Sequence, residues 1–168
     1  MDYQIRKMQM DDWPEVKQIY QQGIDTNLAT FQVECPTRRE WDEAHLKDCR
    51  LIIAEGVKIL GWAALSRVSS RSVYAGVAEV SIYIDSEYRG RGIGKKLLHE
   101  LVCCSERNGF WMLQASIMRE NTASIRLHKS CGFRIVGYRE KIGRDRFGTW
   151  RDTILMERRS KSENFGDA

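Results

Sequence analysis

The sequence predicts a single α/β domain built on a mixed β-sheet. Strand-like and helix-like segments alternate in the order β-α-α-β-β-β-α-β-α-β-β, without a repeat or a low-complexity segment. The 168 residues are enough for one hydrophobic core and not obviously for two. Apolar residues make up 42% and charged residues 30%, as in ordinary water-soluble proteins. We expect one domain over 1–159 and a polar, frayed tail over 160–168.

The amino-terminal part is predicted to form a strand and a helix. Residues 3–6 alternate polar and apolar side chains, as a short strand does. Asp11 or Asp12 can cap the following helix, and Pro14 is tolerated in its first turn. The apolar positions of this helix share one face: Trp13, Val16, Ile19, Tyr20 and Ile24.

A second helix and two strands come next. Residues 27–34 form an irregular link, and the capping-box sequence at 37–40 predicts a helix that runs to about Asp48. Residues 51–54 and 58–65 are predicted to be strands because they are rich in apolar and β-branched side chains and are separated by a short turn.

The middle of the chain combines a strand, a glycine-rich loop and a helix. The strand ends at Ile84, and the apolar periodicity of the helix begins at Ile93 and continues to about Asn108. A further strand is expected over 111–117.

The last elements are predicted to be a short helix and a hairpin. The helix covers 121–130 and is ended by Gly132, as a carboxy-terminal glycine often does. Residues 133–141 and 149–157 can pair around a turn at 144–148. The whole order gives about seven strands and four helices.

Composition limits the cellular setting and the partners. No stretch approaches the roughly 20 apolar residues of a membrane span, and the first residues lack the layout of a secretory signal, so we expect a cytoplasmic protein. The net charge of +4 suits an anionic ligand, but 23 acidic residues offset the 27 basic ones and disfavour a nucleic-acid partner. The odd number of cysteines, without a C-x-x-C pair, disfavours disulfides and a zinc site, so we expect small buried thiols. They are Cys35, Cys49, Cys103, Cys104 and Cys131.

The most informative segment is the loop Arg89-Gly90-Arg91-Gly92-Ile93-Gly94 between the central strand and its helix. Glycines let backbone N–H groups approach an anion closely, and the first turn of a helix adds unpaired N–H donors. A Rossmann loop would need its third glycine at the position of Lys95, and a Walker loop would need its first at the position of Arg89. The segment therefore predicts a phosphate-binding loop of neither class.

A second motif, Asn121-Thr122-Ala123-Ser124-Ile125-Arg126-Leu127-His128 followed by Gly132-Phe133, lies downstream of this loop. In this order the two motifs resemble those of the GNAT superfamily of acyl-CoA N-acyltransferases. The resemblance implies a GNAT fold, with a mixed, mostly antiparallel twisted sheet that splays near its centre. It also implies acetyl-CoA as co-substrate and no metal.

The resemblance further implies how the co-substrate is held. The central strand would pair with the pantetheine amides as an added strand does, and the glycine loop would hold the pyrophosphate. Asn121 can contact the pantetheine or serve only as a helix cap. The implied cofactor-binding residues are Ile82, Tyr83, Ile84, Arg89, Gly90, Arg91, Gly92, Ile93, Gly94, Asn121 and Ser124.

Two residues are candidates for the chemistry. Acetyl transfer to an amine requires removal of the amine proton, and Glu79, just before the cofactor strand, is the candidate base. In the alternative interpretation, Glu79 is only a solvated carboxylate on a strand. His128 stands where many GNAT members have a tyrosine that protonates the leaving sulfur. Alternatively, His128 binds the acceptor, or it is a structural histidine whose hydrogen bonds are satisfied on a helix face.

Further segments resemble the phosphinothricin and methionine-sulfoximine acetyltransferase branch of GNAT: 30–31, 36–41, 78–84 and 147–152. The branch acetylates the α-amino group of small glutamate-like or methionine-derived amino acids, and the resemblance implies a detoxifying homodimer. The link at 32–35 matches the branch only partly.

Four residues are candidates for binding the acceptor. Arg67, Arg71 and Tyr74 can supply cations and a hydroxyl to its anionic end, and Phe31 can wall the pocket. The alternatives are solvated loop charges for the arginines and a core position for Phe31. Two other functions stay open: acetylation of protein N-termini or lysine, and non-catalytic acyl-CoA sensing.

Overall fold

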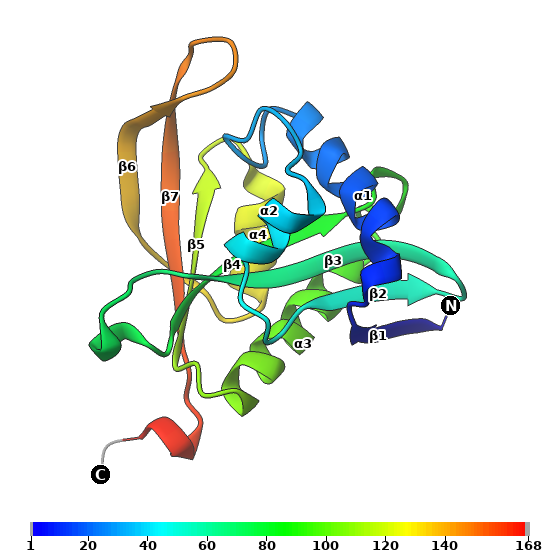
Figure 1. Cartoon of the computed structure of the whole chain (residues 1–168). Helices are drawn as coiled ribbons and strands as arrows, with labels where there is room; N and C mark the ends of the chain where they lie inside the picture. The colour runs from blue at the N-terminus through cyan, green and yellow to red at the C-terminus, as the bar shows by residue number, and fades with distance from the viewer. Residues whose placement is uncertain (1, 167–168) are drawn as a thin grey trace.

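Seven strands form one sheet in the order β1-β2-β3-β4-β5-β7-β6 in the computed structural model, which describes residues 2–166 (Figure 1). The strands are β1 (Tyr3–Lys7), β2 (Leu51–Glu55), β3 (Lys58–Arg67), β4 (Val77–Ile84), β5 (Met112–Met118), β6 (Arg134–Arg144) and β7 (Trp150–Arg159). The helices are α1 (Trp13–Asp25), α2 (Arg38–Ala44), α3 (Ile93–Arg107) and α4 (Thr122–Ser130). The predicted α/β fold class, element order and mixed, mostly antiparallel sheet are confirmed.

The sheet opens at its centre. All neighbouring strands pair antiparallel except β4 and β5, which pair in parallel through Val77–Met112, Ala78–Leu113 and Glu79–Gln114. Beyond Glu79, the described residues of β4 and β5 no longer pair. The predicted central splay is therefore present, and it begins at Glu79.

Helices cover both faces of the sheet (Figure 1). The apolar faces of α1 and α2 pack on one side, where Trp41 and Trp62 are almost fully buried. The apolar face of α3 packs on the other side, together with residues of β5 and β7. Because β2 and β3 are covered on both faces, their sequences are nearly continuous apolar runs.

One predicted boundary and the predicted fraying of the tail are wrong. Helix α2 ends at Ala44, short of Asp48, because His45 is extended and the Leu46 N–H donates to the Leu65 carbonyl at 2.7 Å. The tail is held rather than frayed over its described part: the Arg159 guanidinium donates to the carbonyl of Phe165 at 2.9 Å. Residues 167–168 lie outside the described residues.

The cysteines only partly match the prediction. Among the described residues all five thiols are free. Cys49 is buried as expected, whereas the other four are half-buried.

A polar network ties the β6–β7 turn to the irregular link after α1. The buried carboxylate of Asp145 accepts hydrogen bonds from the backbone N–H groups of Phe147 and Thr149, at 2.9 and 3.0 Å. It also accepts from the Asn27 side chain at 3.0 Å and from the Arg151 guanidinium at 3.1 Å. Arg151 in turn donates to the Asn27 carbonyl at 2.9 Å, so the link is anchored to the hairpin.

We predict that this network makes stability depend on pH. Burial alone would raise the pKa of Asp145, but the hydrogen bonds from Asn27, Thr149, Arg151 and Phe147 lower the pKa to about 2. Because the pKa is lower in the folded chain than in the unfolded one, the stabilisation is complete above about pH 4 and is lost as the pH falls toward 2.

Urea unfolding at several pH values checks this expectation. The wild type should lose more unfolding free energy between pH 4 and 2 than Asp145→Asn, while the exposed-site control Asp11→Asn should behave as the wild type. Parallel curves for wild type and Asp145→Asn would contradict the role assigned to Asp145.

Candidate active site

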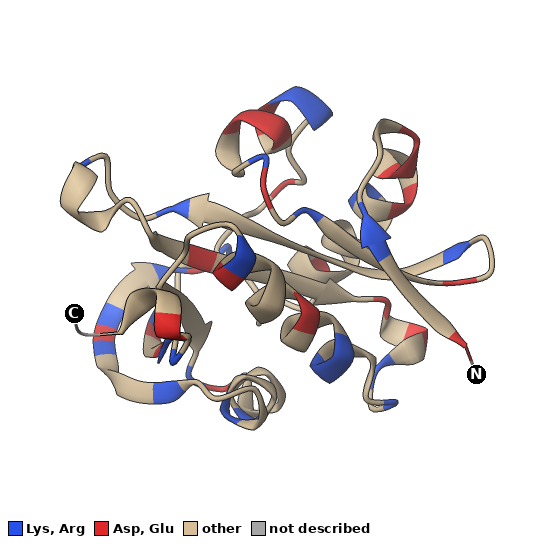
Figure 2. Ribbon diagram, turned by 90° about the horizontal axis from the view of Figure 1, so that it is seen from below, with Lys and Arg blue, Asp and Glu red and all other residues tan. Residues whose placement is uncertain are grey.

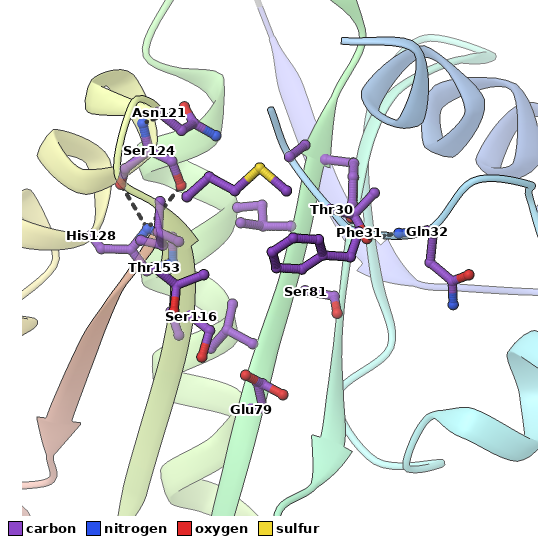
Figure 3. A pocket seen from close by; sticks show the side chains of 17 residues that line it. Thr30, Phe31, Gln32, Glu79, Ser81, Ser116, Asn121, Ser124, His128 and Thr153 are labelled. Atoms are coloured by element: carbon purple, nitrogen blue, oxygen red, sulfur yellow. Dashed lines mark hydrogen bonds between the residues drawn. The ribbon is translucent and has the colours of Figure 1, made fainter. Parts of the chain in front are cut away.

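Two connected hollows follow the central splay. The first, which we call the splay cavity, has a volume of about 520 Å³ and lies between β4, β5, α4 and the link at 29–32 (Figure 3). The second, the loop groove, has a volume of about 490 Å³ and follows the glycine loop. The two share Ala29, Ile82, Tyr83, Asn121 and Ser124. They therefore form one continuous path from the loop to the centre of the sheet.

The loop groove is shaped by glycines in left-handed conformation. Gly90 and Gly92 have φ values of +75° and +76°, which other residues adopt only with strain. Gly92 is the N-cap of α3, so the first turn of that helix begins at the loop, and its N–H donors lack partners within the helix. The guanidinium of Arg91 lies 4.9 Å from the ring centre of Tyr88, beside the loop. These features fit the predicted phosphate cradle.

One side of both hollows is formed by the edge of β4, which contributes Ile82 and Tyr83 to each. Beyond Glu79, β4 continues to pair with β3 on one side, up to the Gly61–Ile84 pair, while its other edge has no strand partner among the described residues. The ring of Tyr83 packs against the rings of Tyr20 and Trp62, with a distance of 4.9 Å between ring centres in each pair. The backbone of Tyr83 lies on the edge of β4 that no longer pairs with β5. Unpaired N–H and C=O groups along such an edge can bind an extended amide chain.

Glu79 lies at the point where β4 and β5 separate, which we call the fork. It is the last residue of β4 that pairs with β5. Its half-buried side chain points into the splay cavity (Figure 3). The structure therefore brings the candidate base to the inner end of the path that starts at the glycine loop.

Helix α4 supplies the opposite wall. The Asn121 side chain caps the helix, since its oxygen accepts from the Ser124 N–H at 3.3 Å, and its amide also donates to the Leu28 carbonyl at 3.4 Å. His128 lies one turn beyond Ser124 and is only 2% exposed. Both expected roles of Asn121, as cap and as lining of the cofactor path, are compatible with this placement.

The state of His128 follows from its contacts. Its Nδ1 lies 2.8 Å from the Ser124 carbonyl, and a carbonyl can only accept, so Nδ1 carries the proton. Burial lowers the pKa of the ring, which therefore stays neutral at pH 7 and leaves Nε2 as a bare acceptor. Donating a proton to a leaving group would need the imidazolium form, which this environment disfavours.

The candidate acceptor residues are brought together only in part. Phe31 lines the splay cavity and packs at Gly143 of the hairpin. Arg71 and Tyr74 lie on the exposed β3–β4 connection, where the guanidinium sits 5.6 Å from the ring centre, and neither lines the cavity. Arg67 ends β3 and is also exposed. A role for these three in acceptor binding stays a prediction.

Two polar residues of the cavity carry no sequence signal. Ser116 of β5 and Thr153 of β7 line it, but neither belongs to a motif. Only strand register, which pairs Met118 with Thr153, places them there.

Three further features concern metal-binding groups, membrane spans and the distribution of charge. Within them, no group of three or more His, Cys, Asp or Glu side chains is arranged to hold a metal ion. None of the helices described is both long and apolar enough to cross a membrane. Basic and acidic positions are interspersed over the helices and strands in the view of Figure 2.

Comparisons with known proteins agree with this geometry. The sequence model of the acetyltransferase (GNAT) family matches residues 3–133. A phosphinothricin N-acetyltransferase from Alcaligenes faecalis is 34% identical over 160 residues, which cover 92% of this chain and 81% of that protein. An L-methionine sulfoximine/L-methionine sulfone acetyltransferase from Salmonella typhimurium is 30% identical over 158 residues, 91% of this chain and 92% of that one.

A solved structure is similar as well. The phosphinothricin acetyltransferase from Sinorhizobium meliloti, in complex with acetyl-CoA, superposes with a TM-score of 0.87 at 28% identity, covering 100% of this chain and 94% of the other. Together with the family match over most of the sequence, these similarities establish that the chain belongs to the acetyltransferase (GNAT) family.

Proposed function

We propose that this protein transfers the acetyl group of acetyl-CoA to the α-amino group of a small amino acid, of the phosphinothricin, methionine sulfoximine or methionine sulfone type. One observation carries the proposal: a continuous path leads from the glycine loop along the free edge of β4 to Glu79. The names of the relatives from Alcaligenes and Salmonella support the acceptor class.

The donor would occupy the path from loop to fork. The pyrophosphate would bind the N–H groups of 89–94, and the pantetheine amides would pair with the backbone of 82–84. Asn121 and Ser124 line the stretch shared by both hollows and would contact the pantetheine. The thioester would then lie in the splay cavity, within reach of the acceptor.

Glu79 would act as the base. Amino groups have pKa values of about 8 to 10.4, so at pH 7 the amine must lose a proton before it attacks the thioester carbonyl. The Glu79 carboxylate would take that proton, directly or through water. A backbone N–H at the fork would stabilise the oxyanion. As the C–S bond breaks, the nitrogen would release its second proton to solvent, and coenzyme A would leave as the thiolate, which takes up a proton from solvent to become the free thiol.

The setting of the reaction belongs to the same proposal. A detoxifying enzyme of this class would work in the cytoplasm. The edge strand β6 exposes Ile135, Val136, Tyr138 and Ile142, each at least 44% exposed, and we propose that a second copy of the chain covers it.

Purified protein tested with acetyl-CoA on a panel of acceptors decides the function. We expect free thiol to be released with methionine sulfoximine, methionine sulfone or phosphinothricin, and not with peptides bearing a free N-terminus or lysine. Turnover of peptides alone would favour the protein-acetylating alternative. Binding of acetyl-CoA without any turnover would favour the sensor.

Glu79→Gln should lower kcat at least tenfold, because the amide cannot accept the amine proton, while coenzyme A binding persists. Steady-state kinetics and calorimetry measure the two effects. Glu55→Gln, at the end of β2, is the control and should leave both unchanged. Full activity of Glu79→Gln would remove this residue from the mechanism.

Gly92→Val should weaken coenzyme A binding about tenfold or more, because a β-branched residue is strained at φ +76° and distorts the loop. The matched control is Gly56→Val in the β2–β3 turn, where φ is +58° and a Cβ also meets open space. The control should lose stability and keep its affinity for coenzyme A. Equal affinities in calorimetry for both variants would overturn the cradle assignment.

A further inference from the structure

Two residues that line the splay cavity each carry a buried polar atom that the protein does not satisfy. Among the described residues, four buried side-chain polar atoms lack a hydrogen-bond partner, and two of them belong to residues that line this cavity: His128 Nε2 and Thr153 Oγ1. The two residues are only 2% and 4% exposed. Each such atom costs free energy unless a bound molecule completes its hydrogen bonds.

The hydrogen-bonding capacities of the two atoms are complementary. Nε2 can only accept, because the ring proton is on Nδ1 and bonded to the Ser124 carbonyl. The Thr153 hydroxyl can donate one hydrogen bond and accept others. Figure 3 shows both side chains on the same side of the cavity, toward α4 and β5. A water molecule that accepts from Thr153 and donates to His128 would satisfy both and keep one hydrogen free.

The position of His128 and Thr153 along the path indicates which group would accept a hydrogen bond from the free hydrogen of this water. Ser124 lines both hollows, whereas His128, one helical turn later, and Thr153 line only the splay cavity. Glu79 lines the same cavity from the β4 side. With the donor bound as proposed above, the thioester lies between these two walls. The free hydrogen would then face the sulfur side, away from the base.

We propose that His128 and Thr153 hold one ordered water molecule whose free hydrogen is donated to the sulfur of coenzyme A as the C–S bond breaks. This inference rests on the proposed acetyl transfer. In it, His128 acts as a hydrogen-bond acceptor and Thr153 as a positioning residue. A thioester sulfur is a weak acceptor and a thiolate a strong one, so the hydrogen bond strengthens as the reaction proceeds.

Thr153→Val tests the proposal because it keeps the shape of the side chain and removes only the hydroxyl. We expect kcat to fall roughly 10- to 100-fold, the effect of one hydrogen bond to a developing charge, with KM for acetyl-CoA unchanged. Thr153→Ser restores the hydroxyl and should recover most of kcat. Because no described protein group bonds the hydroxyl, the melting temperature of Thr153→Val should stay within about 3 °C of the wild type.

A high-resolution crystal structure of the wild type with coenzyme A completes the test. We expect a water within hydrogen-bond distance of His128 Nε2, Thr153 Oγ1 and the sulfur, absent in Thr153→Val. A direct hydrogen bond between the two side chains without water, or a Thr153→Val variant with wild-type kcat, would overturn the proposal. So would an equal loss of kcat in Thr153→Ser.

Failure of the proposed function gives a different pattern. A wild type that turns over none of the amino acids would refute that function, and the water seen or missing beside the bound coenzyme A sulfur would still decide the role of this pair.

Discussion

The structure depends on one incomplete strand pairing. Strand β4 pairs with β3 along its length, and β5 pairs with β7 from Met112 to Met118, but β4 and β5 pair only as far as Glu79. Each side of the fork is therefore held by a strand on its outer flank, and the splay cavity lies between the two sides. The unpaired edge of β4 costs free energy unless an extended ligand or water completes it. The proposed binding path therefore follows the edge of β4 whose backbone hydrogen bonds to β5 are not formed.

Where β4 and β5 no longer pair, side-chain hydrogen bonds and ion pairs of Arg151 connect the two sides of the molecule. Arg151 of β7 donates to the Asn27 carbonyl, to Asp145 and, at 3.2 Å, to Glu120. These contacts join the hairpin on one side of the cavity to the link that carries Phe31 on the other. The spacing between the hairpin and the link that carries Phe31 therefore depends on a polar network that lies outside the splay cavity.

What could be predicted from sequence is what local signals determine. The capping box of Thr37 and Glu40 and the cap at Asn121 act over three residues, and both are present. The early end of α2 could not be predicted, because Leu46 bonds to Leu65, nineteen positions away in sequence. Arg71 is near Glu79 in sequence but lies outside the cavity, whereas Thr153 reaches it only through strand register.

The four buried polar atoms without a partner among the described residues lie in two different surroundings. The indole N–H groups of Trp41 and Trp62 also lack partners among the described residues, but these rings meet edge to face at 5.5 Å, where aromatic faces can accept weakly. His128 and Thr153 line a cavity instead. A valine would fit the shape of Thr153 without an unsatisfied hydroxyl, so folding alone gives no reason to place a threonine there. The water molecule proposed above would give this hydroxyl its hydrogen-bond partner.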